Sequence, residues 1–112
     1  MNIETIHVSL KKDLEQFSYP IFVGNNLLTR ADELLEKYIQ NKKIIIIHDN
    51  FFSSKLLLNE AFKEFIKLIK EKTLSVNLIA ISGGDQTKNM LELTNIIEQS
   101  LLYEIDRECV II

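Results

Sequence analysis

The chain has 112 residues, which is enough for one domain with a core of its own, and its 46% apolar and 26% charged residues are ordinary for a globular protein. A net charge of −3 gives no broad attraction to nucleic acid or to an anionic membrane. Cys109 is the only cysteine, so no internal disulfide can form, and the first residues lack the basic and apolar regions of a signal peptide. We therefore expect a cytoplasmic protein with neither a nucleic-acid nor a membrane partner.

The N-terminal part predicts an antiparallel β-hairpin. Residues 3–10 alternate between apolar and polar side chains, which is typical of a half-buried strand. After a charged link, a second strand is predicted over residues 19–23, and Gly24 ends it. Pro20 lacks an N–H group, so this strand belongs at an edge.

The remaining chain alternates between strand and helix. Ile44 to Ile47 form a continuous β-branched run, which is typical of a central parallel strand buried on both faces. Helices are predicted on either side of that run, and further strands follow them. In chain order the expected elements are helix 27–40, strand 44–47, helix 53–70, strand 74–81, helix 86–103 and strand 108–112.

The spacing of apolar residues also predicts which helix faces are buried. In the helix expected over residues 53–70 the inward residues are Leu58, Ala61, Phe62, Phe65 and Ile69. The last helix is expected to bury Met90, Leu93, Ile97 and Leu101.

This order predicts an α/β fold, with a Rossmann-like parallel sheet flanked by helices and preceded by the hairpin. Ligands of such sheets bind outside the carboxyl ends of the strands. Asp49 follows one predicted strand and residues 82–88 follow another, so we expect both segments on one edge. A carboxylate there can accept hydrogen bonds from ribose hydroxyls. Alternatively, Asp49 caps the next helix or turn.

Gly83 and Gly84 permit a sharp turn and close approach of the backbone to a ligand. Asp85 is expected at the N-cap of the next helix. Lys88 would then lie in the first helical turn, where a cation opposes the helix dipole unless an anion such as a phosphate compensates. The alternative is that Lys88 points into water and pairs with Asp85 or Glu92.

Other constellations point to structural roles. His7 and His48 have no metal-ligand spacing, so no metal site is predicted, and His48 is interpreted as a satisfied histidine at a strand end. Cys109 lies in an apolar strand and is interpreted as a packing residue. Asp106 and Arg107 are interpreted as a turn pair. No residue is predicted to be catalytic.

Three segments resemble the N-terminal domain of the 3-dehydroquinate synthase family. They are Gly84-Asp-Gln-Thr-Lys-Asn-Met90 with Asp106-Arg107 after a helix, Ser18-Tyr-Pro-Ile-Phe-Val-Gly24, and Ile47-His-Asp49. They occur in the family's order and at similar spacing over nearly the whole chain. Asp85 stands where the family has glutamate, Phe51 stands where it often has asparagine, and the family's triple-glycine phosphate loop would lie beyond Ile112.

The resemblance implies that residues 1–112 are an N-terminal dinucleotide-binding domain without the metal- and substrate-binding domain. The implied enzyme is an NAD-dependent, phosphate-eliminating lyase of the shikimate pathway of aromatic amino acid and chorismate biosynthesis. It converts 3-deoxy-D-arabino-heptulosonate 7-phosphate, a phosphosugar, to 3-dehydroquinate, with zinc or cobalt in the full-length protein. The implied NAD-binding residues are Asp49, Gly83, Gly84, Asp85, Gln86, Thr87 and Lys88.

The fragment alone is expected to be inactive, to bind NAD weakly, and to form a homodimer or larger oligomer through residues 109–112. Two alternatives stay open. The chain could belong to another sugar-phosphate cyclase or to an iron-type alcohol or glycerol dehydrogenase, or it could be a non-catalytic ligand-binding module.

Overall fold

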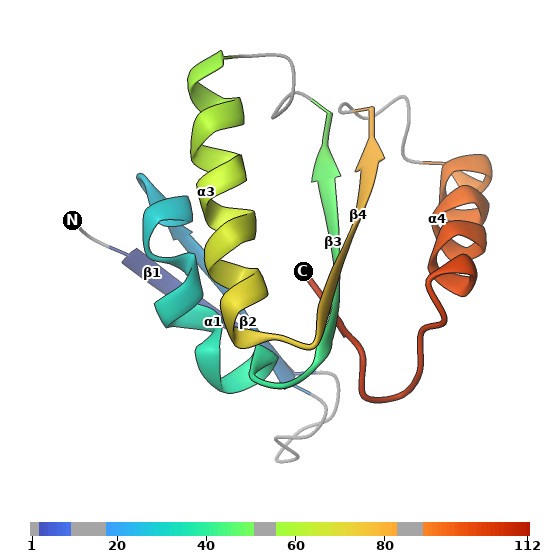
Figure 1. Cartoon of the computed structure of the whole chain (residues 1–112), viewed down its shortest axis with the longest axis horizontal. Coiled ribbons are helices and arrows are strands. Elements are labelled where there is room, and N and C mark those ends of the chain that lie inside the picture. Colours follow the sequence, from blue (N-terminus) through green and yellow to red (C-terminus); the bar gives the residue numbers. More distant parts are fainter. Residues whose placement is uncertain (1–2, 10–17, 51–55, 83–88) are drawn as a thin grey trace.

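A computed structural model describes residues 3–9, 18–50, 56–82 and 89–112 of the chain. In chain order the elements are β1 (Ile3–Ser9), β2 (Ser18–Gly24), the 3₁₀ helix η2 (Leu27–Thr29), α1 (Ala31–Ile39), β3 (Lys43–Asp49), α3 (Leu56–Lys72), β4 (Ser75–Ile81), α4 (Met90–Leu102) and β5 (Val110–Ile111). They form a parallel three-stranded sheet with helices on both faces and a separate antiparallel hairpin (Figure 1). The predicted fold class is confirmed.

The parallel sheet has the strand order β4-β3-β5, so β3 lies in the centre. β3 pairs with β4 along its whole length, from Lys43 opposite Ser75 to Asp49 opposite Ile81. Side chains on both faces of β3 are buried. Ile44 packs in the core with residues of α1 and α3. Ile45 points to the opposite face and is only 1% exposed. The β-branched run 44–47 therefore predicted the central strand correctly.

The main core lies between the sheet and the helices α1 and α3. The residues of this core come from η2, α1, β3 and α3. They are Ile39, Ile44, Ile46, Phe62, Phe65 and Ile69, with Leu28, Ala31, Leu35 and Tyr38 packed beside them. Phe62, Phe65 and Ile69 form the inward stripe of α3, as its spacing predicted. Leu58 belongs to the part of α3 whose side chains are not described.

The helix predicted over residues 27–40 is interrupted at Arg30, where η2 ends and α1 begins. The backbone of Arg30 lies at φ −124° and ψ 1°, outside the helical region. The Thr29 hydroxyl donates a hydrogen bond of 2.8 Å to the Asn26 carbonyl, which stabilises the short 3₁₀ turn separately. The spacing of apolar residues does not reveal this break, because apolar residues continue at helical spacing on both sides of Arg30.

A charged contact joins the ends of α1 and α3. The Lys72 ammonium lies 3.3 Å from a Glu36 carboxylate oxygen and 3.6 Å from an Asp32 carboxylate oxygen. Desolvation lowers the pKa of Lys72, but the Glu36 and Asp32 carboxylates outweigh it and the pKa is raised. The Glu36 side chain is 53% exposed and the Lys72 side chain 26%, so solvent screens much of the attraction and the contact contributes modestly to stability.

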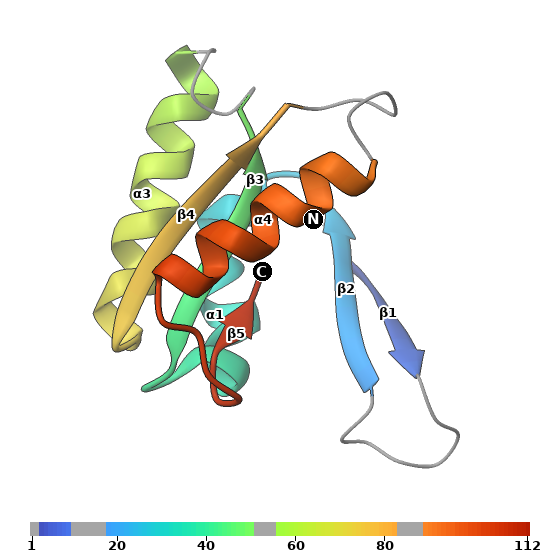
Figure 2. The same ribbon diagram turned by 90° about the vertical axis from the view of Figure 1, so that its right-hand side faces the viewer.

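The hairpin β1-β2 lies beside the parallel sheet and is not part of it (Figure 2). Its register pairs Ile6 with Ile21 and His7 with Pro20. In a two-stranded sheet each strand has an outer edge, so a residue that lacks a backbone N–H, such as Pro20, is tolerated there. The predicted hairpin is confirmed.

The predicted inner face of α4 is wrong. Ser100 is the buried residue of α4, at 4% exposure, and Ile96 on the same side is half-buried. The Tyr103 hydroxyl, just after the helix, donates to the Leu78 carbonyl of β4 at 3.3 Å. The predicted stripe is turned about 100° away, since each helical residue advances by that angle. All of its members are exposed to solvent, namely Met90, Leu93, Ile97 and Leu101. We call these four residues the apolar face of α4.

Candidate functional site: the carboxyl edge of the parallel sheet

The carboxyl ends of β3 and β4 meet at one edge of the sheet. Asp49 lies opposite Ile81, and the Asn50 N–H donates to the Ile81 carbonyl at 2.8 Å, which extends the pairing one residue beyond β3. Both strands end on the same side of the molecule, at the tips of the two arrows in Figure 1. Ser82 follows directly on β4. The register therefore places Asp49 beside the start of the segment that contains the glycine pair.

The third strand, β5, runs parallel to β3 and toward the same edge. The Ile47 N–H donates to the Ile112 carbonyl at 2.8 Å, so the last residue of the chain lies two residues below Asp49. The carboxyl ends of β3 and β4 thus lie together, as the strand and helix order predicts. The convergence is confirmed for Asp49 and Ser82, whereas β5 is paired with β3 only at Ile44 and Ile45.

Six of the seven predicted cofactor-binding residues lie outside the described residues. They are Gly83, Gly84, Asp85, Gln86, Thr87 and Lys88. Asp49 is the seventh, and it is half-buried at the end of β3. The roles of all seven residues stay predictions.

α4 begins later than the sequence pattern predicted. Its N-cap is Asn89, whose side-chain oxygen accepts a hydrogen bond of 2.9 Å from the Glu92 N–H. The predicted start at Gln86, with Asp85 as the N-cap and Lys88 in the first turn, is therefore wrong. Asn89 and Glu92 stand in the spacing of a capping box, and this signal in the sequence identifies the correct start.

His48 has the structural role that the sequence predicted. Its ring lies 4.6 Å from the ring of Phe62, a core residue of α3, and its Nδ1 lies 3.1 Å from the Asp49 carbonyl oxygen. These two contacts hold the end of β3 against α3. His48 therefore helps to position Asp49 at the edge of the sheet.

Asp106 also has its predicted role as a turn residue. Its carboxylate accepts a hydrogen bond of 2.8 Å from the Glu108 N–H, and its carbonyl accepts one of 3.2 Å from the Cys109 N–H. A side-chain acceptor two residues before its donor is typical of an Asx turn. This turn leads the chain from α4 into β5.

The Cys109 thiol is held in its protonated form. Partial burial raises its pKa above the ordinary value of 9.0, the Asp106 carboxylate raises it further, and Lys43 opposes both effects.

Within the described residues no group of three or more histidine, cysteine, aspartate or glutamate side chains could hold a metal ion. No described helix is long and apolar enough to span a membrane.

The raised pKa makes Cys109 a slow nucleophile, since the thiolate is the reactive form. We expect the pH profile of its alkylation by iodoacetamide to have a midpoint above 9.0. Asp106→Asn should move that midpoint to lower pH, because it removes a negative charge while the amide oxygen still accepts from the Glu108 N–H. Stopped-flow or mass-spectrometric rates check this, and an unchanged midpoint would show that Asp106 does not act on the thiol.

Comparison with known proteins relates the chain to one group of enzymes. No protein-family model matches the sequence. The 3-dehydroquinate synthase of Hydrogenovibrio crunogenus is 30% identical over 101 residues, which are 90% of this chain and 26% of that enzyme. The Zymomonas mobilis 3-dehydroquinate synthase is 29% identical over 94% of this chain and 26% of its own length. The chloroplastic enzyme of Solanum lycopersicum is 28% identical over 87% of this chain and 21% of its own length.

Solved structures show the same fold. A crystal structure of 2-deoxy-scyllo-inosose synthase in complex with carbaglucose-6-phosphate, NAD⁺ and Co²⁺ matches 96% of this chain and 26% of its own chain, with a TM-score of 0.62 and 15% identity. The chain spans about a quarter of the length of the curated relatives that it matches. The sequence of this chain therefore resembles that of the 3-dehydroquinate synthases, as its motifs predicted. The resemblance extends over about a quarter of the length of those enzymes.

Proposed function

We propose that residues 1–112 form the N-terminal, NAD-binding domain of a 3-dehydroquinate synthase. The complete enzyme would convert 3-deoxy-D-arabino-heptulosonate 7-phosphate to 3-dehydroquinate and phosphate. Sequence relatives with that name support the proposal, and so does the sheet shared with a structure that binds NAD⁺. As proposed, the enzyme acts in the cytoplasm as a homodimer, and the segment alone is inactive.

The observation that carries the proposal is the register of β3 against β4. Asp49 lies opposite Ile81 at the end of β4, and the segment 83–88 follows β4 in the sequence, which supports a ligand site shared by Asp49 and that segment. We assign to Asp49 the role of accepting hydrogen bonds from a ribose hydroxyl. The half-buried position of Asp49 fits this role, since a carboxylate near low-dielectric walls forms stronger hydrogen bonds than one in open water.

The glycine pair and the residues after it complete the proposed site. Gly83 and Gly84 would let the backbone approach the cofactor, with Asp85, Gln86, Thr87 and Lys88 around it. Bound NAD would supply reversible oxidation of a substrate carbon. The zinc or cobalt ion of the complete enzyme would be held by residues of the second domain, which this segment does not include.

The role of Asp49 is testable by titrating the chain with NAD. We expect weak binding by the wild-type chain and a further loss of about tenfold to a hundredfold in Asp49→Ala, since a hydrogen bond to a charged group contributes roughly 1.5–3 kcal/mol. Asp49→Asn should lose less, because its amide keeps one acceptor. Chemical shifts in amide NMR spectra report weak binding and show where the ligand contacts the chain.

Glu98→Gln, on the exposed side of α4, is the matched control and should leave the affinity for NAD unchanged. Equal affinities of wild type and Asp49→Ala would contradict the role of Asp49. Shift changes that avoid residues 47–50 and 81–82 would contradict the site itself.

A second candidate function has support in the fold. The chain could belong to another sugar-phosphate cyclase, because a structure of 2-deoxy-scyllo-inosose synthase superposes on 96% of this chain with a TM-score of 0.62. The higher sequence identity to 3-dehydroquinate synthases favours the first proposal. Phosphate release by the complete protein from a heptulosonate phosphate, compared with release from a hexose phosphate, distinguishes the two.

A further inference from the structure

The peptide group that follows Asp49, at the end of β3, is held from two sides. Its N–H belongs to Asn50 and donates to the Ile81 carbonyl at 2.8 Å. Its carbonyl belongs to Asp49, and the His48 Nδ1 lies 3.1 Å from the carbonyl oxygen. A trans peptide group points its N–H and its C=O in opposite directions. The end of β4 therefore holds one side of this group, and the His48 ring holds the other.

The direction of the His48 hydrogen bond follows from its partner. A carbonyl oxygen only accepts hydrogen bonds, so the His48 Nδ1 carries a proton and donates it to the Asp49 carbonyl. A neutral imidazole has a single N–H group, which leaves Nε2 unprotonated. The contact therefore requires one of the two neutral tautomers of His48.

Packing against the core supports the ring that makes this bond. The centre of the His48 ring lies 4.6 Å from the centre of the Phe62 ring, with an angle of 50° between the two planes. A tilted aromatic pair at this distance is favourable. Phe62 is 7% exposed, and its ring stacks with that of Phe65 at 6.0 Å. The end of β3 is thus connected through His48 to the core below it.

We propose that His48 is a positioning residue of the cofactor site, whose Nδ1–H fixes the peptide group after Asp49 and thereby holds the Asp49 carboxylate ready for a ribose hydroxyl. The orientation of this peptide group sets the ψ angle of Asp49. A backbone that is fixed before the ligand arrives loses less conformational freedom when the ligand binds. The effect on NAD rests on the proposed function, whereas the contact between His48 and Asp49 does not.

Two substitutions separate the hydrogen bond of His48 from its packing. His48→Phe keeps an aromatic ring against Phe62 and removes the donor. His48→Asn removes the ring and keeps a donor, because the side-chain nitrogen of asparagine is attached to Cγ as Nδ1 is in histidine. A residue that only packs would tolerate phenylalanine better than asparagine, and the proposal predicts the opposite order.

The affinity for NAD should follow the donor. We expect His48→Phe to weaken NAD binding by about threefold to tenfold, which is the effect of one neutral hydrogen bond, and His48→Asn to recover most of the affinity. Since His48 acts through Asp49, adding His48→Phe to Asp49→Ala should cause no further loss. Chemical-shift titrations of the amide NMR spectrum with NAD measure all four variants, and the same spectra report whether each one is folded.

Two measurements without NAD test the contact itself. Long-range ¹H–¹⁵N NMR spectra of the neutral His48 ring should show the proton on Nδ1. The amide of Asn50 belongs to the same peptide group as the Asp49 carbonyl, so its hydrogen exchange should quicken by at least about threefold in His48→Phe. In His48→Asn the exchange at Asn50 should stay close to that of the wild type.

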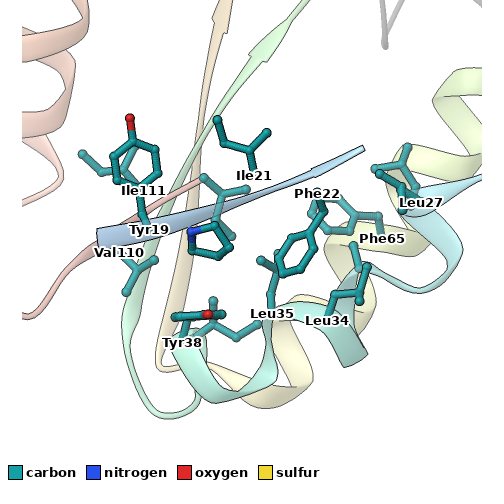
Figure 3. A pocket seen from close by; sticks show the side chains of 15 residues that line it. Tyr19, Ile21, Phe22, Leu27, Leu34, Leu35, Tyr38, Phe65, Val110 and Ile111 are labelled. Carbon is teal, nitrogen blue, oxygen red and sulfur yellow. The ribbon is translucent and has the colours of Figure 1, made fainter. Parts of the chain in front are cut away.

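A control for lost apolar packing comes from another part of the core. An apolar slot of about 490 Å³ is lined by residues of β2, α1 and the end of β5, and neither His48 nor Asp49 lines it (Figure 3). Leu34 is one of the residues that line this slot. Leu34→Ala should leave the affinity for NAD within about twofold of the wild type, since sites that share no partner act independently.

Three results would overturn the proposal. One is a neutral His48 ring with its proton on Nε2, and another is an Asn50 amide that exchanges equally fast in His48→Phe and in the wild type. The third is an affinity for NAD that Asp49→Ala weakens and His48→Phe leaves unchanged.

A failure of the NAD site gives a different pattern of results. Asp49→Ala would then bind NAD like the wild type, while exchange at Asn50 is still faster in His48→Phe. That combination would contradict the cofactor role of Asp49 and support the positioning contact made by His48.

Discussion

Replacing Ile69 with alanine is expected to lower the free energy of unfolding by about 3 kcal/mol, because the substitution leaves a cavity in the packed core. Ile69 is 0% exposed and packs in the cluster of residues between α3 and β3. The loss combines the transfer free energy of the deleted methyl and methylene groups with the cost of the void. Urea denaturation followed by circular dichroism measures it.

Leu101→Ala is the matched control on the other side of the sheet. Leu101 belongs to the apolar face of α4 and is 64% exposed, so its truncation should change the free energy of unfolding by less than about 0.5 kcal/mol. The sequence pattern alone would predict similar losses for both residues. Equal losses would mean that the apolar face of α4 is covered in the folded chain.

Adding charge to the apolar face of α4 is expected to weaken self-association of the chain by at least about tenfold in the dissociation constant. Ile97 is 51% exposed, and together with Leu101 it forms the middle and end of this face. Burial of these exposed apolar side chains against another apolar surface is favourable, because it removes them from water. The variant Ile97→Glu with Leu101→Glu should therefore sediment closer to the monomer mass of 13.0 kDa than the wild type does.

Glu98→Gln changes charge on the same helix without touching the apolar face, and it should sediment like the wild type. Wild-type chain that stays monomeric at high concentration would contradict the expectation. The sequence placed the association at residues 109–112, and this location stays a prediction. Sedimentation of the Ile111→Glu variant distinguishes the two locations, since weaker self-association would indicate residues 109–112 and unchanged self-association would indicate α4.

The sequence by itself determined the order of the strands and helices, but not the break at Arg30 or the start of α4. Four β-branched residues at 44–47 favour a strand buried on both faces, so the centre of the sheet could be predicted from the sequence. The alternation in residues 3–10 and the edge position of Pro20 likewise follow from backbone geometry. Once parallel strands were identified, the convergence of Asp49 and Ser82 at one edge followed from chain direction.

Only the tertiary structure decided which surfaces meet. An apolar stripe shows that a helix has a face to bury, but its spacing does not say whether the described sheet buries it. In α4 the buried side carries Ser100, and the Tyr103 hydroxyl just after the helix donates to the Leu78 carbonyl, 25 residues earlier in the chain, a contact that helical spacing does not encode.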